Sequence, residues 1–268
     1  MYETKVNLNT AAISEPVFSP VRYLDQIFSE LSIERDIRFK EAVNGRRYER
    51  LLLDVISPSG DIKRDRPAII WAHGGGLSDG SKDSPLERYC ANEMAKKGYV
   101  IVSINYRLRR GAESDFTEAM RNAAEDVVSA FEWLVSNSQR HAVDRSKITL
   151  AGYSAGAEIV TNLCYTKLVD GWDRSRVFSV VDVAGNRLFY GNALEKSPPC
   201  LVIHGTDDTI NPIEASRLLI ESLKCGSIDC ELKTVMNSNH YFNGNMNNLK
   251  DIGRLIAQFI YERLRLHF

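Results

Sequence analysis

The pentapeptide Gly152-Tyr-Ser-Ala-Gly156 is the feature that most constrains how this chain can fold. It lies between a short apolar run, typical of a strand, and a helix-compatible segment. A serine at such a junction occupies a tight turn, and the flanking glycines remove Cβ atoms that would collide with the strand and the helix. The serine hydroxyl then stands beside unpaired N–H groups at the start of the helix, which stabilise negative charge. The pattern indicates a nucleophile at Ser154, although an ordinary structural turn also fits these five residues alone.

Composition narrows the class of protein. A chain of 268 residues with 44% hydrophobic content suits one large α/β domain, residues 1–268. Lys plus Arg total 34 against 35 for Asp plus Glu, so the charge balance favours neither nucleic acid nor an anionic membrane as a partner. The polar start and the absence of a long apolar run predict a soluble, cytoplasmic protein.

The order of apolar segments predicts a mostly parallel sheet. Residues 36–43 and 47–57 alternate around Asn44-Gly45, the pattern of an antiparallel hairpin. Further apolar strands are expected within 67–73, 99–105, 147–153, 177–185, 200–205 and 231–236. They alternate with segments of helical spacing at 84–97, 115–134, 155–160, 213–223 and 249–260. Parallel neighbours need crossover connections, so helices should cover both faces of the sheet.

Residues 1–35 form an N-terminal extension. Leu24, Ile27, Phe28 and Leu31 fall at helical spacing and predict a short amphipathic helix between Ser14 and Glu34. Two placements are open for this helix: over the mouth of the site, or on the back of the sheet.

Residues able to do chemistry follow the predicted strands. Gly74–Gly76 follow one strand, Ser154 another, Asp207 and Asp208 a third, and His240 a fourth. In an open α/β sheet, ligands bind at the carboxyl ends of the strands. These residues should therefore meet at one edge of the sheet.

These motifs resemble those of α/β-hydrolases of the carboxylesterase and hormone-sensitive-lipase-like group. The resemblance rests on His73-Gly-Gly-Gly76, Gly152-Tyr-Ser-Ala-Gly156, His204-Gly-Thr-Asp-Asp208 and Asn239-His240, in the order of nucleophile, acid and base expected of that fold. It implies a three-layer α/β-hydrolase fold with little or no inserted cap, since only about a dozen residues separate Gly185 from Pro198. Ala157 stands where a third glycine is common in one branch, so the subfamily stays open.

The resemblance implies a role for each residue. Ser154 is the expected nucleophile and His240 the expected base, while the His-Gly-x-x-Asp spacing favours Asp208 as the acid over Asp207 and Asp182. The N–H groups of Gly75, Gly76 and Ala155 are the expected oxyanion hole. His73 and His204 are expected to brace the backbone.

The expected function is hydrolysis of small carboxylic esters through an acyl-enzyme on Ser154, with no metal and no cofactor. Amidase, formamidase or acyltransferase chemistry uses the same apparatus, and a non-catalytic binding protein on this scaffold is the alternative from another class. The expected partner is a small-molecule ester, with compact acyl groups preferred; the oligomeric state is open. The five cysteines are expected to be reduced, although Cys225 and Cys230 flank a turn and could be bridged.

Overall fold

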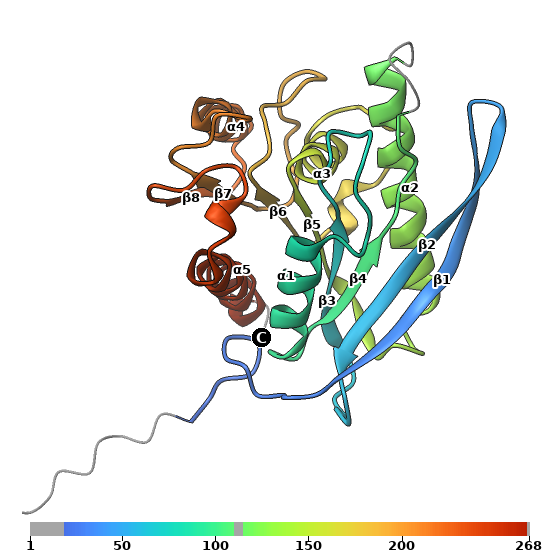
Figure 1. Ribbon diagram of the computed structural model, residues 1–268, viewed down its shortest axis with the longest axis vertical. Helices are drawn as coiled ribbons and strands as arrows, with labels where there is room; N and C mark the ends of the chain where they lie inside the picture. Colours follow the sequence, from blue (N-terminus) through green and yellow to red (C-terminus); the bar gives the residue numbers. More distant parts are fainter. Residues whose placement is uncertain (1–18, 110–114, 267–268) are drawn as a thin grey trace, which may run out of the picture.

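A single eight-stranded sheet runs through the molecule, as shown in a computed structural model that describes residues 19–109 and 115–266 (Figure 1). The strands are β1 (Leu31–Asn44), β2 (Arg47–Pro58), β3 (Arg66–Ala72), β4 (Val100–Ile104), β5 (Val143–Tyr153), β6 (Ser179–Val183), β7 (Cys200–Gly205) and β8 (Cys230–Val235). The helices are α1 (Pro85–Ala95), α2 (Phe116–Ser136), α3 (Ala155–Tyr165), α4 (Ile213–Cys225) and α5 (Met246–Leu266), with 3-10 turns at Arg174–Arg176 and Phe242–Gly244.

The strand order is β1-β2-β4-β3-β5-β6-β7-β8. Strands β3 to β8 pair in parallel, whereas β1 with β2 and β2 with β4 pair antiparallel. The predicted hairpin is therefore confirmed, and Gly45 adopts the positive φ of 63° that its tight turn requires. The predicted mostly parallel sheet is confirmed as well.

Helices cover both faces of the sheet and make three layers. Helices α2, α3 and α4 pack on one face, and α1 and α5 pack on the other (Figure 1). Side chains of β3 alternate between the two cores: Ile70 belongs to the first, and Ile69 and Trp71 to the second. Both faces are buried, which is why this strand is an unbroken apolar run in the sequence.

The predicted N-terminal helix is wrong for the part that the structure describes. Residues 19–30 form a turn and an extended segment, and β1 already begins at Leu31. The N–H of Tyr23 donates to the carbonyl of Lys97, and the N–H groups of Ile27 and Phe28 donate to that of Lys96. Tertiary hydrogen bonds thus replace the helical ones, and of the four apolar residues Leu31 packs against the core as the first residue of β1.

This segment lies far from the strand ends that carry the predicted site residues. Lys96 and Lys97 precede β4, so they lie at the edge of the sheet where the parallel strands begin, opposite the edge where β5 leads to Ser154 (Figure 1). Residues 19–30 therefore do not cover the mouth of the site. The first part of the predicted helix, residues 14–18, lies outside the described residues.

None of the helices in the described ranges combines the length and the apolar character that a membrane crossing requires.

Candidate active site

The turn between β5 and α3 holds Ser154 in a strained conformation. Its φ is 52° and its ψ is −120°, a combination that non-glycine residues rarely adopt. A Cβ added to Gly152 would lie 2.2 Å from the backbone of Gly156, and one added to Gly156 would lie 2.1 Å from the carbonyl oxygen of Ala72. Only glycine at both positions lets α3 pack this closely on β5 and β3, which explains the spacing in the sequence.

Three predicted residues meet at this turn. The Nε2 atom of His240 lies 2.9 Å from Oγ of Ser154, and its Nδ1 atom lies 2.7 Å from Oδ2 of Asp208. The other oxygen of Asp208 accepts the N–H groups of Ile210 and Asn211, both at 2.9 Å. These bonds fix the carboxylate, and the carboxylate in turn orients the imidazole toward the serine.

The other candidate acids lie elsewhere. Asp207 is exposed and its carboxylate accepts the hydroxyl of Thr206. Asp182 is fully buried in β6, where its Oδ1 atom accepts the N–H of Gly185. The geometry therefore favours Asp208, the residue that the spacing indicated.

His73 and His204 brace the backbone, as expected. His73 stacks on Tyr106 with ring centroids 4.2 Å apart, and its Nδ1 atom lies 2.6 Å from the carbonyl oxygen of Gly74. Burial lowers the pKa of His73 to about 4, so the ring is neutral. His204 lies between the hydroxyl of Ser216 and the carbonyl of Asn211, and burial lowers its pKa. It thereby ties β7 to the loop that presents Asp208.

The glycine loop after β3 faces Ser154 across a pocket. Gly75 has a φ of 117°, and a Cβ there would lie 2.0 Å from the carbonyl oxygen of Asp79. The carbonyl of Gly75 accepts the N–H groups of Ser78 and Asp79, which closes the loop. Within the described residues, the N–H groups of Gly75, Gly76 and Ala155 donate to no protein acceptor. All three residues line the pocket that contains Ser154.

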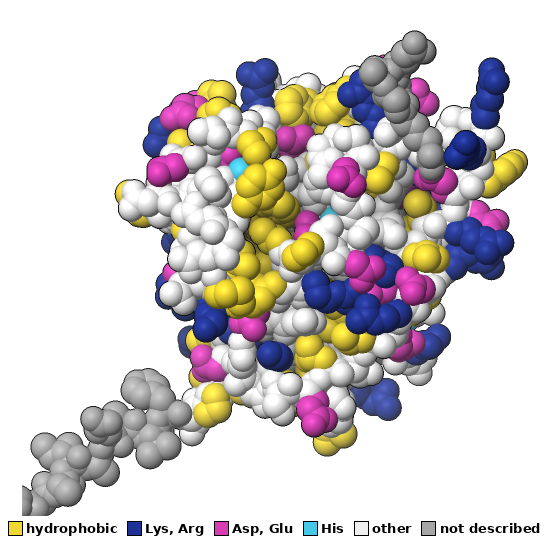
Figure 2. All heavy atoms as spheres, viewed as in Figure 1, with side chains coloured by type: hydrophobic (Ala, Val, Ile, Leu, Met, Phe, Trp, Pro, Cys, Tyr) yellow, Lys and Arg dark blue, Asp and Glu magenta, His cyan; other side chains and the backbone are white. Residues whose placement is uncertain are grey.

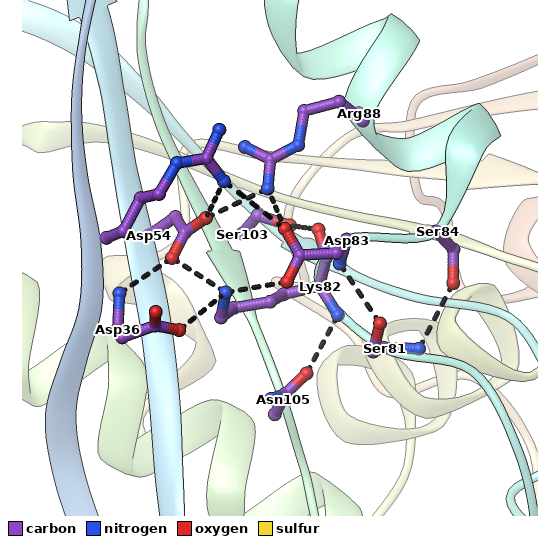
Figure 3. Close-up of polar contacts among 10 residues, drawn as sticks. Asp36, Asp54, Ser81, Lys82, Asp83, Ser84, Arg88, Ser103 and Asn105 are labelled. Atoms are coloured by element: carbon purple, nitrogen blue, oxygen red, sulfur yellow. Dashed lines mark hydrogen bonds and ion pairs between the residues drawn. The ribbon is translucent and has the colours of Figure 1, made fainter.

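A network of charged side chains anchors the far end of this loop (Figure 3). The ammonium of Lys82, 4% exposed, pairs with Asp36, Asp54 and Asp83 at 2.8 to 3.0 Å. Arg88 at the start of α1 adds a 2.9 Å contact to the fully buried Asp54. These cations hold the pKa of Asp54 below its ordinary value, against the opposing effect of burial.

Backbone contacts complete the anchor. The N–H of Lys82 donates to the side chain of Asn105, and its carbonyl accepts the hydroxyl of Ser103 (Figure 3). The network therefore fixes the loop between the glycines and α1 to β2 and β4, and this fixes where the glycine N–H groups point.

Two pockets adjoin the site. The first has a volume of about 280 Å³ and is lined by Gly75, Gly76, Phe116, Tyr153, Ser154, Ala155, Glu158, Ile210, Asn211, His240 and Tyr241. The second, about 630 Å³, lies between α1 and α5 and shares Gly75, Tyr153 and Tyr241 with the first. Its walls include Leu86, Tyr89, Met246 and Leu249, and Figure 2 shows a band of hydrophobic side chains on this face.

Two residues of the site, Glu158 and Asn211, were not predicted from the sequence. Glu158 is 8% exposed, and burial raises the pKa of its carboxyl to about 7. A glutamate in an amphipathic helix normally faces water, so its type alone is no signal. Its position one helical turn after Ser154 could have identified it, because residues four apart share a helix face. Asn211 follows Asp208 at the carboxyl end of β7, a second positional signal.

Two further features bear on the chemistry of the site. The segment between Gly185 and Pro198 contains no helix and packs on α3 through a hydrogen bond from Leu194 to Tyr165. In the described part of the chain, no group of three or more His, Cys, Asp or Glu side chains is arranged to hold a metal ion.

The fold and the serine turn define the class: this is an α/β-hydrolase by fold. The BD-FAE family model matches residues 53–183, just under half of the chain and including Ser154. Fumonisin B1 esterase of Sphingopyxis macrogoltabida is 33% identical over 122 residues, which are 42% of this chain and 22% of that protein. Gut esterase 1 of Caenorhabditis elegans is 30% identical over 143 residues, 50% of this chain and 24% of that protein. The matched segments thus span about a quarter of these relatives or less.

Solved structures are similar over nearly the whole fold. Thermogutta terrifontis esterase 2, phosphoramylated by tabun, superposes with a TM-score of 0.70 at 21% identity, over 86% of this chain and 94% of that one. Its propionate-bound structure gives 0.69 at 22% identity, over 90% and 97%. This likeness confirms the predicted fold class.

Proposed function

We propose that the protein is a single-domain serine hydrolase that cleaves small carboxylic esters. The observation that carries the proposal is the hydrogen-bonded series from Asp208 through His240 to Ser154, which ends in a pocket faced by free backbone N–H groups. The similarity to segments of named esterases supports the same reaction class. We also propose that the protein is cytoplasmic. Thiols are kept reduced in the cytoplasm, and all five cysteines, Cys225 and Cys230 included, are unpaired.

The residues have distinct roles in the proposed reaction. Oγ of Ser154 attacks the ester carbonyl carbon while Nε2 of His240 takes its proton. The carbonyl oxygen becomes an oxyanion and accepts hydrogen bonds from the N–H groups of Gly75, Gly76 and Ala155. Asp208 holds the imidazole in the required tautomer and stabilises its protonated form.

The intermediate then collapses and the alcohol leaves with the proton from His240. Water, activated by the same imidazole, attacks the acyl group on Ser154, and the serine is regenerated. No step needs a metal or a cofactor. The larger apolar pocket between α1 and α5 has room for one substituent of the ester. The preference for compact acyl groups stays a prediction, which kcat/KM measured on esters of graded acyl length would test.

A fluorophosphonate probe tests the proposal. It should label the wild-type protein and the Ser146→Ala variant, in which an exposed serine is removed, but not Ser154→Ala. The variants that react with the probe should also hydrolyse p-nitrophenyl acetate, and Ser154→Ala should not. A wild-type protein that neither reacts with the probe nor turns over esters would instead be a binding protein on a hydrolase scaffold. Anilides and formamides assayed in parallel distinguish an esterase from an amidase.

A further inference from the structure

Glu158 lines the pocket that contains Ser154. Glu158 lies in the first turn of α3, where its N–H donates to the carbonyl of Ser154 at 3.0 Å. Ser154 and Glu158 line the same pocket, so a substrate bound at Ser154 comes within reach of Glu158. Glu158 is 8% exposed, so its carboxyl group is shielded from most of the solvent.

Among the residues that the structure describes, no cation pairs with this carboxyl group. None of the ion pairs found among the described residues includes Glu158. The side-chain amides of Asn186 and Asn211 interact with it and offset part of the effect of burial on its pKa. Asp54 differs in this respect, because this fully buried carboxylate has Lys82 and Arg88 as partners. A buried carboxylate without a cation is costly unless something else neutralises it.

Three acidic groups of the described chain interact electrostatically with Glu158. They are Asp182 from β6, Tyr106 after β4 and Tyr190 from the segment between β6 and β7. Asp182 is fully buried, and its Oδ2 atom has no hydrogen-bond partner in the described structure. The two tyrosines are uncharged at neutral pH, because their pKa values are raised, so the negative potential on this side of the pocket comes from the carboxyl groups of Glu158 and Asp182 when they ionise.

The remaining walls suit a cation as well. Phe116, Tyr153 and Tyr241 line the same pocket. The faces of aromatic rings attract cations, and the attraction is strongest where water is excluded. A pocket lined by a buried glutamate, three aromatic side chains and the amide of Asn211 can hold an ammonium group better than an uncharged group of the same shape.

Resting on the proposed ester hydrolysis, we propose that this pocket selects esters that carry an ammonium group a few bonds from the scissile carbonyl, with Glu158 as the specificity-determining residue. The pocket takes the cationic substituent, and the larger apolar pocket between α1 and α5 takes the other substituent of the ester. Glu158 takes no part in bond making or breaking.

The selectivity should depend on pH. Burial raises the pKa of Glu158 to about 7, so the group is neutral at pH 5.5 and charged at pH 8. A cationic substrate gains from this ionisation and an uncharged one does not. The ratio of kcat/KM for the two substrates cancels any effect of pH that is common to both.

Pairs of isosteric esters provide the test. On the alcohol side the pair is 2-(trimethylammonio)ethyl acetate and 3,3-dimethylbutyl acetate; on the acyl side it is methyl trimethylammonioacetate and methyl 3,3-dimethylbutanoate. The ammonium group keeps its charge at every pH, and acid release is followed in a pH-stat. For one of the pairs, the ratio of charged to uncharged kcat/KM should be about ten or more at pH 8, and should fall severalfold by pH 5.5.

The Glu158→Gln variant should remove this preference. Its ratio of charged to uncharged kcat/KM should fall to about the wild-type value at pH 5.5 and stay constant with pH. Asp207→Asn, which removes an exposed carboxylate near the site, should keep the wild-type ratio at both pH values.

Two outcomes overturn the assignment of Glu158. One is a ratio near one for both pairs in an active wild-type enzyme, and the other is a preference that survives in Glu158→Gln. Either leaves the proposed ester hydrolysis intact, because the uncharged esters are still cleaved. Failure of the wild-type protein to cleave any ester would overturn both proposals at once.

Discussion

Asp208 shows how single atoms define a role. Its Oδ2 atom lies 2.7 Å from Nδ1 of His240, and its Oδ1 atom accepts two backbone N–H groups. The carboxylate of the neighbouring Asp207 instead accepts the hydroxyl of Thr206. Asp208→Asn removes the charge and favours the wrong imidazole tautomer, so kcat/KM should fall by about three to four orders of magnitude. Asp207→Asn should lower it less than about twofold, since exposed substitutions have small effects. Initial rates on p-nitrophenyl acetate compare the two variants.

Similar losses in both variants would mean that the imidazole is held by the loop as a whole and not by one carboxylate. An intact near-ultraviolet circular dichroism spectrum of Asp208→Asn is the necessary control, because Oδ1 also fastens the turn at Ile210 and Asn211.

The sequence predicts the role of a single residue where that residue has a fixed place in a motif. Ser154, Asp208 and His240 could be selected because each follows a strand in an order typical of the fold. The burial of Glu158 could not be predicted in this way. Its burial depends on Asn186 and Asn211, which come from two other loops, and no local pattern predicts that these loops meet at α3.

At the scale of elements, the loop from Gly74 to Ser84 is held at both ends. One end is the serine turn, because Gly156 packs on Ala72, and the other end is the network of Lys82 with Asp54 and Asp83 (Figure 3). The sequence predicted β3 before the loop, because its apolar run is continuous, and a helix at 84–97 after it, because the segment has helical spacing. It could not predict the network, which joins residues from β2, the loop and α1 that are far apart in the chain.

The loop makes Gly75→Ala a sensitive test of the proposed oxyanion hole. The new Cβ would lie 2.0 Å from the carbonyl oxygen of Asp79 at a φ of 117°, so the loop must move. Loss of an aligned N–H donor costs about 3 kcal/mol, and kcat/KM should fall by a hundredfold or more. KM should change little, because the donors act on the charge of the transition state.

Gly60→Ala is the matched control for backbone strain. Gly60 also has a positive φ, 69°, but a Cβ there meets nothing within 4 Å, and the residue lies in the turn after β2. It should lose about 1 kcal/mol or more of stability with kcat/KM unchanged. Equal activity in both variants would argue against a role for the glycine loop.

At the scale of the whole molecule, buried carboxyl groups lie in two kinds of environment. Asp54 is paired with cations that lower its pKa, and its charge is kept. Asp182 lies in the middle of the sheet without a cation, and burial raises its pKa to about 7. Both positions looked like interior strand residues in the sequence, so only the tertiary partners distinguish them.

Asp182 should make the free energy of unfolding depend on pH. Its ordinary pKa is 3.8, and the folded value is about 7, so between these values the folded chain holds a proton that the unfolded chain releases. Stability from this group is therefore intact below about pH 4 and is lost progressively up to about pH 7, by on the order of a few kcal/mol. Asp182→Asn removes this dependence. The atom that replaces Oδ2 still has no hydrogen-bond partner, so the variant also loses an amount of stability that does not change with pH.

Urea unfolding at pH 4.5, 6 and 8 measures the effect as the difference between Asp182→Asn and the wild type. This difference should move in favour of the variant by a few kcal/mol as the pH rises. Asp54→Asn is the comparison with the opposite sign of shift: the pKa of Asp54 is lowered, so its stabilisation is lost only as the pH falls below 3.8. Its difference from the wild type should stay unfavourable and nearly constant from pH 4.5 to 8. A constant difference for Asp182→Asn as well would show that Asp182 is ionised in the folded protein, and that an unrecognised partner neutralises it.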